Sequence, residues 1–81
     1  MPRYFFHFES HGVRVRDEVG FALPDAEAAW YQAARSARDL IRAEASIGCS
    51  WDEQAVEIED DQGVRVDRLP LIEIARFAGA V

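Results

Sequence analysis

Five consecutive ring-bearing residues, from Tyr4 to Phe8, stand near the start of the sequence. Aromatic side chains favour β-strands, in which successive side chains point to opposite faces of the sheet. Alternation places Tyr4, Phe6 and Phe8 on one face of this strand. Phe5 and His7 then point to the other face. A face this bulky needs a neighbouring layer of small side chains if the two layers are to approach closely.

A long alanine-rich helix is predicted to be that layer. Asp25 is a good N-cap and Gly48 a natural C′ residue, so we expect the helix from about Ala26 to Ile47. Its apolar residues recur at three- and four-residue steps and form one stripe: Ala26, Ala29, Trp30, Ala33, Ala37, Leu40 and Ile41. Because most of the stripe is alanine, we expect the aromatic strand to pack closely against it.

A first β-hairpin is predicted before the helix. A four-residue loop ending at Gly12, which tolerates a positive φ, pairs Phe8 with Val13 and Phe6 with Val15. The same register makes two pairs on the opposite face: His7 beside Arg14 and Phe5 beside Arg16.

A second hairpin is predicted after the helix, and its register stays open. A three-residue loop, 61–63, with Gly63 left-handed, makes these pairs: Ile58 with Val66 and Glu59 with Arg65. A five-residue loop makes these instead: Ile58 with Val64 and Glu57 with Arg65. Leu71 to Ala78 is expected to form a short helix, with an extended tail as the alternative.

These elements predict an α+β fold: an antiparallel sheet of about four strands, in the order β-β-α-β-β with a short C-terminal helix, packed on one long helix. The 81 residues are too few for more than one domain, so we expect a single small α+β domain over residues 1–81. The order of strands within the sheet is left open.

The charge balance narrows the choice of partners. Nine arginines and no lysine face fifteen acidic residues, for a net charge of −6. Duplex nucleic acid and anionic membranes are therefore disfavoured partners. No apolar run approaches the roughly 20 residues of a membrane helix, and we expect no signal peptide. Cys49 is the single cysteine, which excludes an intrachain disulfide and indicates a cytoplasmic protein.

Catalytic and metal sites are weakly signalled. His7 and His11 have a metal-ligand spacing for a helix, but here they fall on a strand and its loop. Cys49 follows a helix C-terminus, where the helix dipole disfavours a thiolate. No phosphate-binding loop or dinucleotide fingerprint is present. We therefore expect no metal and no cofactor, and a small enzyme is the less favoured hypothesis.

Two surfaces are candidates for binding. The outer sheet face carries Phe5, His7, Arg14 and Arg16, which form a possible stacking platform for single-stranded nucleic acid, although Glu57 and Glu59 share that face. The helix carries a basic stripe, Arg35, Arg38 and Arg42, with Asp39 placed to pair with Arg35. This stripe is either a solvated helix face or a docking surface for an acidic partner.

Element lengths favour the interaction hypothesis. A 22-residue helix is about 33 Å long, whereas strands of five or six residues span about 17–20 Å, so we expect the helix to overhang the sheet. The outer sheet face, and Phe5 above all, needs a cover from the C-terminal segment or from a second copy. We therefore predict a non-catalytic protein-interaction or regulatory module that binds itself, as a homodimer, or another protein.

Several segments together resemble a known family. They are the opening Met1 to Phe8, then Arg16-Asp17-Glu18-x-Gly20, Leu23-Pro24-Asp25 before the helix, Val56-Glu57-Ile58-x-Asp60-x-x-Gly63 and Leu69-Pro70. The chain resembles a family of short bacterial proteins catalogued only as a domain of unknown function. The resemblance implies a small cytoplasmic bacterial protein and brings no established activity, cofactor or catalytic residue.

Overall fold

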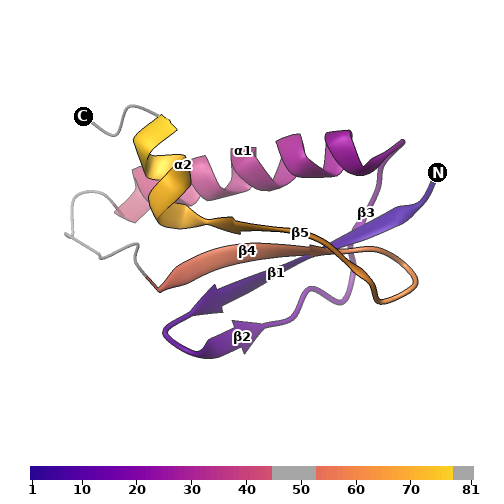
Figure 1. Ribbon diagram of the computed structural model, residues 1–81, viewed down its shortest axis with the longest axis horizontal. Coiled ribbons are helices and arrows are strands. Elements are labelled where there is room, and N and C mark those ends of the chain that lie inside the picture. Colours follow the sequence, from indigo (N-terminus) through magenta and orange to yellow (C-terminus); the bar gives the residue numbers. More distant parts are fainter. Residues whose placement is uncertain (45–52, 78–81) are drawn as a thin grey trace.

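The computed structural model describes residues 1–44 and 53–77 (Figure 1). Its elements follow in this order: β1 (Arg3–Ser10), β2 (Val13–Val15), β3 (Phe21–Ala22), α1 (Ala26–Glu44), β4 (Gln54–Glu59), β5 (Arg65–Pro70) and α2 (Leu71–Phe77). The α+β prediction is confirmed, and the C-terminal segment is helical rather than extended. The predicted helix end near Ile47, together with Cys49 and Trp51, lies outside the described residues.

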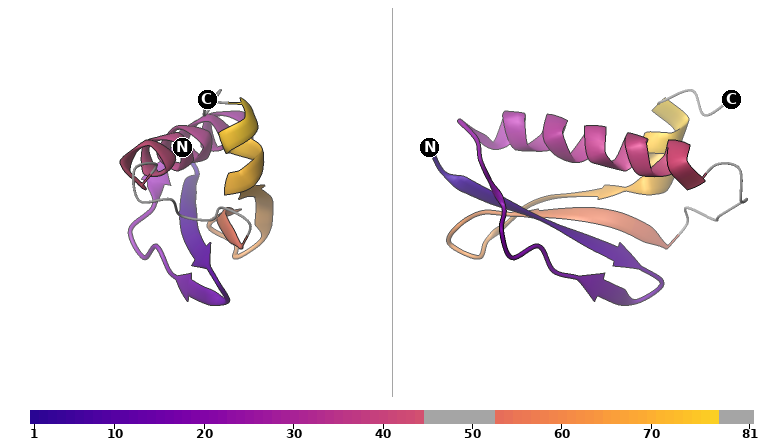
Figure 2. Two further views of the ribbon diagram at one scale, coloured as in Figure 1. Left: turned by 90° about the vertical axis from the view of Figure 1, so that its left-hand side faces the viewer. Right: turned by 180° about the vertical axis from the view of Figure 1, so that it is seen from behind.

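The strands form one antiparallel sheet in the order β2-β1-β4-β5, and the two-residue β3 pairs with the start of β1. The strands β1 and β4 are therefore the central strands, although 43 residues lie between them along the chain. Both helices lie on the same side of the sheet, with α2 beside one end of α1 (Figures 1 and 2). The opposite side, called the outer face below, carries neither of the two helices, α1 and α2.

The core lies between α1 and the central strands. Asp25 caps the helix by accepting a hydrogen bond from the backbone N–H of Ala28 (2.8 Å). One narrow row of α1 is fully buried, at four-residue steps: Ala29, Ala33, Ala37 and Ile41. Opposite this row lie buried side chains of the sheet and α2: Tyr4, Val56, Ile58, Leu69, Leu71, Ile74 and Ala75. The expected close packing of the sheet on a methyl-lined helix is confirmed.

The residues that make this contact are not all the ones predicted. Phe6 and Phe8 are only partly buried, and β4 supplies the fully buried Ile58 instead. Trp30, which we expected in the apolar stripe, is 39% exposed. The stripe that touches the sheet is one residue wide, because alanines let the helix approach closely. Trp30 is one residue after Ala29, so about 100° of helical rotation takes it out of that contact.

The first hairpin is tighter than predicted. The turn has two residues, His11 (φ 50°) and Gly12 (φ 83°), as a type I′ turn requires. Phe8 therefore faces Val15, and Arg14 faces Glu9 instead of His7. Glu9 and Ser10 stay in the strand because they also pair with β4, so the loop cannot begin before His11. The hairpin end extends away from α1 (Figure 1), which leaves both valines of β2 exposed.

The second hairpin follows one of the two predicted registers. Its loop has three residues, 61–63, with Gly63 at φ 77°, and Glu59 pairs with Arg65 as expected. A β-bulge then shifts the register, so that Ile58 faces Asp67 instead of Val66. An extra residue in one strand changes which side chains face the helix layer. The bulge therefore places a carboxylate on the helix side of the β5 edge.

Over the described residues, the helix overhang is smaller than predicted. The described part of α1 has 19 residues, about 28 Å, and the eight-residue β1 spans about 26 Å. β1 is longer than expected because the tight turn leaves Glu9 and Ser10 in the strand. We also expected the C-terminal segment to cover the outer face as one of two alternatives. For α2 this prediction is wrong, because α2 packs on α1, β4 and β5. Neither described helix is apolar enough over a sufficient length to span a membrane.

Candidate functional site

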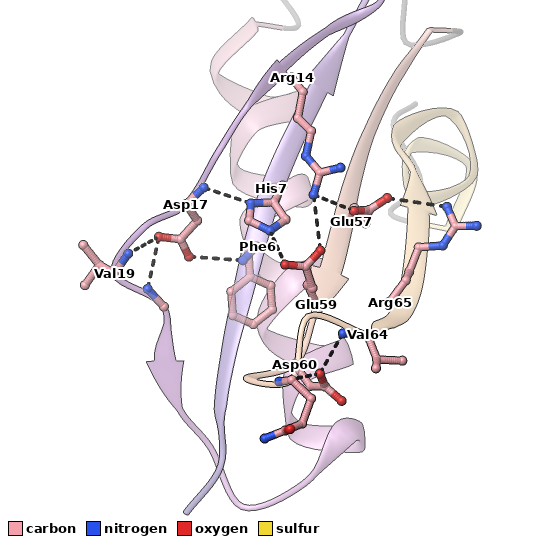
Figure 3. Close-up of polar contacts among 12 residues, drawn as sticks. Phe6, His7, Arg14, Asp17, Val19, Glu57, Glu59, Asp60, Val64 and Arg65 are labelled. Atoms are coloured by element: carbon pink, nitrogen blue, oxygen red, sulfur yellow. Dashed lines mark hydrogen bonds and ion pairs between the residues drawn. The ribbon is translucent and has the colours of Figure 1, made fainter.

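His7 lies buried on the outer face, with 1% of its surface exposed. Its ring Nδ1 accepts a hydrogen bond from the backbone N–H of Asp17 (3.0 Å, Figure 3). The ring proton of the neutral side chain therefore sits on Nε2, which donates to Glu59 Oε1 at 3.4 Å. Both ring nitrogens are engaged within the fold, and because the side chain is buried, His7 is not available to stack on a base.

The Asp17 side chain fills a gap in the sheet. β1 pairs with β3 at Tyr4 and with β2 from Phe8, which leaves Phe6 without a strand partner on that edge. The Asp17 carboxylate accepts hydrogen bonds from three backbone N–H groups, those of Phe6 (3.1 Å), Val19 (3.0 Å) and Gly20 (3.1 Å). Burial acts to raise the pKa of this carboxyl, but the three backbone hydrogen bonds outweigh it and hold the pKa below its ordinary value of 3.8.

Gly20 allows the same segment to cross β1 closely. Its φ is 71°, and a Cβ atom at this position would lie 2.7 Å from the carbonyl oxygen of Tyr4 and 3.0 Å from the ring of Phe5. A side chain here would therefore collide with the backbone of β1. We call residues 16–20 the crossing segment. The segment covers one edge of Phe5, a role that we had expected of the C-terminus or of a second copy.

An ion network occupies the rest of the outer face. Glu57, which is 7% exposed, accepts from Arg14 (2.8 Å) on one side and from Arg65 (3.5 Å) on the other. Arg14 also reaches Glu59 (3.5 Å), and Arg68 pairs with Glu9 (3.0 Å). Within the described residues, no buried side-chain nitrogen or oxygen lacks a hydrogen-bond partner. The charges of this face are therefore neutralised by one another.

The predicted stacking platform is accordingly not an open surface. The structure places Phe5, His7 and Arg14 on the outer face, but His7 is buried and Arg14 is held by carboxylates. Arg16 is exposed, and it makes no ion pair with the described residues. Across residues 1–44 and 53–77, no group of three histidine, cysteine or acidic side chains is arranged to hold a metal ion. His11 instead lies 3.1 Å from Glu53 at the hairpin end.

The second candidate surface is a groove of about 510 Å³ between α1, β5 and α2. It is lined by Trp30, Tyr31, Ala34, Arg35, Arg38, Asp67, Arg68, Leu69, Glu73 and Ile74. Trp30 and Tyr31 make an edge-to-face pair with ring centroids 5.3 Å apart. Tyr31 is 63% exposed, so the aromatic pair presents much of its surface to solvent.

The helix arginines lie beside this groove. Arg35 and Arg38 line it, and Arg42 follows one turn further along α1. All three are exposed, and none has a carboxylate partner among the described residues, so the expected pair of Arg35 with Asp39 is absent there. Asp67 and Glu73 stand on the opposite wall. The groove thus combines exposed rings, an apolar floor and cations that have no carboxylate partner in the described part of the chain.

Sequence reasoning identified Arg35, Arg38 and Arg42 but missed the groove. Trp30 was assigned to the core stripe, and Tyr31 was not singled out. The adjacency of two aromatic residues on a helix was the available signal, because two neighbouring positions cannot both point into a narrow core contact. The contribution of Asp67 could not be found, because it depends on the β-bulge.

Comparison with known proteins gives one match. No curated protein and no solved structure matches the chain. One family model matches residues 3–72, from the start of β1 into α2. The match covers most of the 81 residues and confirms the resemblance drawn from the sequence. The protein belongs to the family described as a domain of unknown function, DUF6894.

Proposed function

We propose that this domain is a non-catalytic protein-interaction module and that the groove between α1, β5 and α2 is its docking surface. The observation that supports this proposal is the exposed Trp30–Tyr31 pair beside two arginines that lack a carboxylate partner among the described residues. Tryptophan, tyrosine and arginine are the residue types that most often dominate the binding energy of protein interfaces.

The chemistry of the groove supports a binding role rather than a catalytic one. Its lining contains no histidine, cysteine or serine among the described residues. The one buried histidine, His7, lies on the outer face and is occupied by Asp17 and Glu59. Both ring nitrogens of His7 are thus used to join segments of the fold, so this side chain is not free to act as a base.

We further propose a bacterial, cytoplasmic setting, which the family resemblance and the single cysteine support. The partner is either another protein or a second copy of this chain. The ion network on the outer face reduces the need for a cover there, so the groove is the better candidate for either contact.

A photo-crosslinker placed at two exposed positions tests the proposal in cells that express the full chain. Tyr31→p-benzoylphenylalanine puts the reactive group in the groove, and Asp61→p-benzoylphenylalanine puts it in the β4–β5 turn. We expect discrete protein adducts from position 31, reduced by Trp30→Ala, and none of the same mass from position 61. An adduct of two chains would identify a second copy as the partner.

The same adducts from both positions, or none from position 31, would contradict the proposal. Circular dichroism of each variant checks that the fold is retained, since both positions are exposed. Mass spectrometry of the adduct then identifies the partner.

A further inference from the structure

We infer that the groove binds an extended acidic segment of a partner protein, with an apolar side chain seated on its floor. This inference rests on the proposed function and specifies the chemistry of the partner. It follows from three properties of the groove: its unpaired cations, their spacing along α1, and the apolar surface between the two walls.

The first property is a contrast in charge pairing. The arginines of the sheet are engaged: Arg14, Arg65 and Arg68 with carboxylates, and Arg3 with the carbonyl oxygens of Val19 and Gly20. The arginines of α1 have no such partner among the described residues. In a chain with fifteen acidic residues and a net charge of −6, a row of cations that finds no carboxylate within residues 1–44 and 53–77 complements negative charge from outside the chain.

The second property is spacing. Arg35, Arg38 and Arg42 follow one another at steps of three and four residues, so they lie along one face of α1. From first to last they span about 10 Å along the helix axis. A compact anion cannot contact all three at once, whereas about three residues of an extended chain cover that length. The row therefore fits several carboxylates along a peptide better than one small anion.

The third property is the apolar surface that the cations border. Ala34 of α1, Leu69 of β5 and Ile74 of α2 are the aliphatic residues that line the groove. An apolar side chain placed there would be removed from water against Trp30, which is 39% exposed in the free chain. Burial of this kind supplies affinity, while the arginines supply orientation.

The opposite wall restricts how such a segment binds. Asp67 and Glu73 would repel carboxylates placed next to β5 and α2, so the acidic residues must face α1. This wall also makes the groove unfavourable for nucleic acid, whose phosphates cannot be confined to one side. A protein segment with acidic residues on one side and apolar or basic residues on the other satisfies both walls.

Fluorescence polarisation with a defined peptide tests the inference. The probe is a labelled twelve-residue peptide of glutamates with two central leucines; control peptides replace every glutamate by lysine, or both leucines by serine. We expect the first peptide to bind and to weaken as salt rises from about 50 to 300 mM. We expect the lysine peptide not to bind and the serine peptide to bind more weakly.

Matched variants locate the binding. The double variant Arg35→Glu, Arg38→Glu should lower the affinity at least about tenfold, because two attractive contacts become repulsive. Arg16→Glu, at an exposed arginine of the crossing segment that also lacks an ion pair within the described residues, should change it less than about twofold. Urea unfolding of each variant confirms that the fold is kept.

Equal losses in both variants, or no binding of the glutamate peptide, would overturn the inference. Tighter binding of a twelve-nucleotide oligothymidylate than of the peptide would assign the groove to single-stranded nucleic acid instead. If the peptide fails while position 31 still gives its specific crosslinks, the acidic segment is wrong and the docking groove stands. Loss of the position-specific crosslinks would contradict both the docking groove and the acidic segment.

Discussion

The outer sheet face and the helix groove use similar residue types in opposite ways. On the outer face His7 and Glu57 are buried, and the arginines Arg14, Arg65 and Arg68 are paired with carboxylates. Along the groove the aromatic rings are exposed, and Arg35 and Arg38 lack such partners within the described part of the chain. The polar groups of the sheet serve the fold, and we propose that those of the helix are left for a partner.

Burial explains why the outer face must satisfy its own charges. A carboxylate such as Glu57 loses most of its hydration in the folded state, and removing one partner of a buried charge leaves that loss uncompensated. Exposed arginines on a helix carry no comparable penalty. Substitutions on the outer face should therefore change stability, and substitutions in the groove should change binding.

The largest effect is expected where the crossing segment touches β1. Gly20→Ala adds a methyl group 2.7 Å from the carbonyl oxygen of Tyr4, at a φ of 71°. Strain and collision together should lower the free energy of unfolding by about 3–4 kcal/mol, measured by urea denaturation. Gly12→Ala is the matched control, because its φ is also positive (83°) but nothing lies within 4 Å of the added atom. It should cost only about 1 kcal/mol, and equal losses would refute the close crossing.

The next effect concerns the carboxylate that replaces a strand partner. Asp17→Ala removes the acceptor of three backbone N–H groups, including that of Phe6 in β1. We expect a loss of about 2–3 kcal/mol by urea denaturation, since unsatisfied backbone donors near the core are costly. Glu18→Ala, at the exposed neighbouring position, should change the unfolding free energy by less than about 0.5 kcal/mol. A small loss for Asp17→Ala would mean that water replaces the carboxylate.

The same carboxylate gives a smaller, pH-dependent effect. The pKa of Asp17 is lowered in the folded chain, so the unfolded chain binds the proton more readily. Its contribution to stability is complete above about pH 5 and is lost as the pH falls through 3.8 and then through the folded pKa. Asp17→Asn should therefore reduce the fall in unfolding free energy between about pH 5 and pH 2.5. An unchanged profile would show that other carboxyls cause the acid loss.

The sequence predicted what depends on neighbours along the chain. Alternation assigned the faces of β1, Asp25 located the start of α1, and Gly63 located the second turn. Prediction from the sequence failed where contacts between segments far apart in the chain determine the structure. The first hairpin tightened because β4, which lies beyond the helix, holds Glu9 and Ser10 in the strand. The burial of His7 depends on the crossing segment, a non-local contact that no periodicity records.

For the candidate sites too, the sequence predicted local features but not the contacts made by the folded chain. The helical spacing of Arg35, Arg38 and Arg42 could be read from sequence, but whether they pair could not. Glu57 was expected on the outer sheet face, and it lies there beside Arg14 and Arg65, but its side chain is buried, which the sequence did not indicate. Burial depends on which strands lie beside each other in the sheet. The two arginines that cover this carboxylate come from different strands, one on each side, so the sequence around Glu57 does not reveal it.

The smallest effect on stability is expected in the groove, and it separates the two faces most sharply. Tyr31→Ala removes a ring that is 63% exposed and touches Trp30 edge to face. Losing that contact should lower the free energy of unfolding by less than about 1 kcal/mol. If the ring serves binding, affinity for the glutamate–leucine peptide should fall by about fivefold or more, which corresponds to about 1 kcal/mol at an interface.

His7→Ala should do the reverse, because the contacts of His7 lie on the other side of the sheet. Urea denaturation should show a clear loss of stability, and the fraction that remains folded should bind the peptide with unchanged affinity. A variant of either face that changed both quantities alike would mean that the groove is part of the folded core and that the two faces do not have separate tasks.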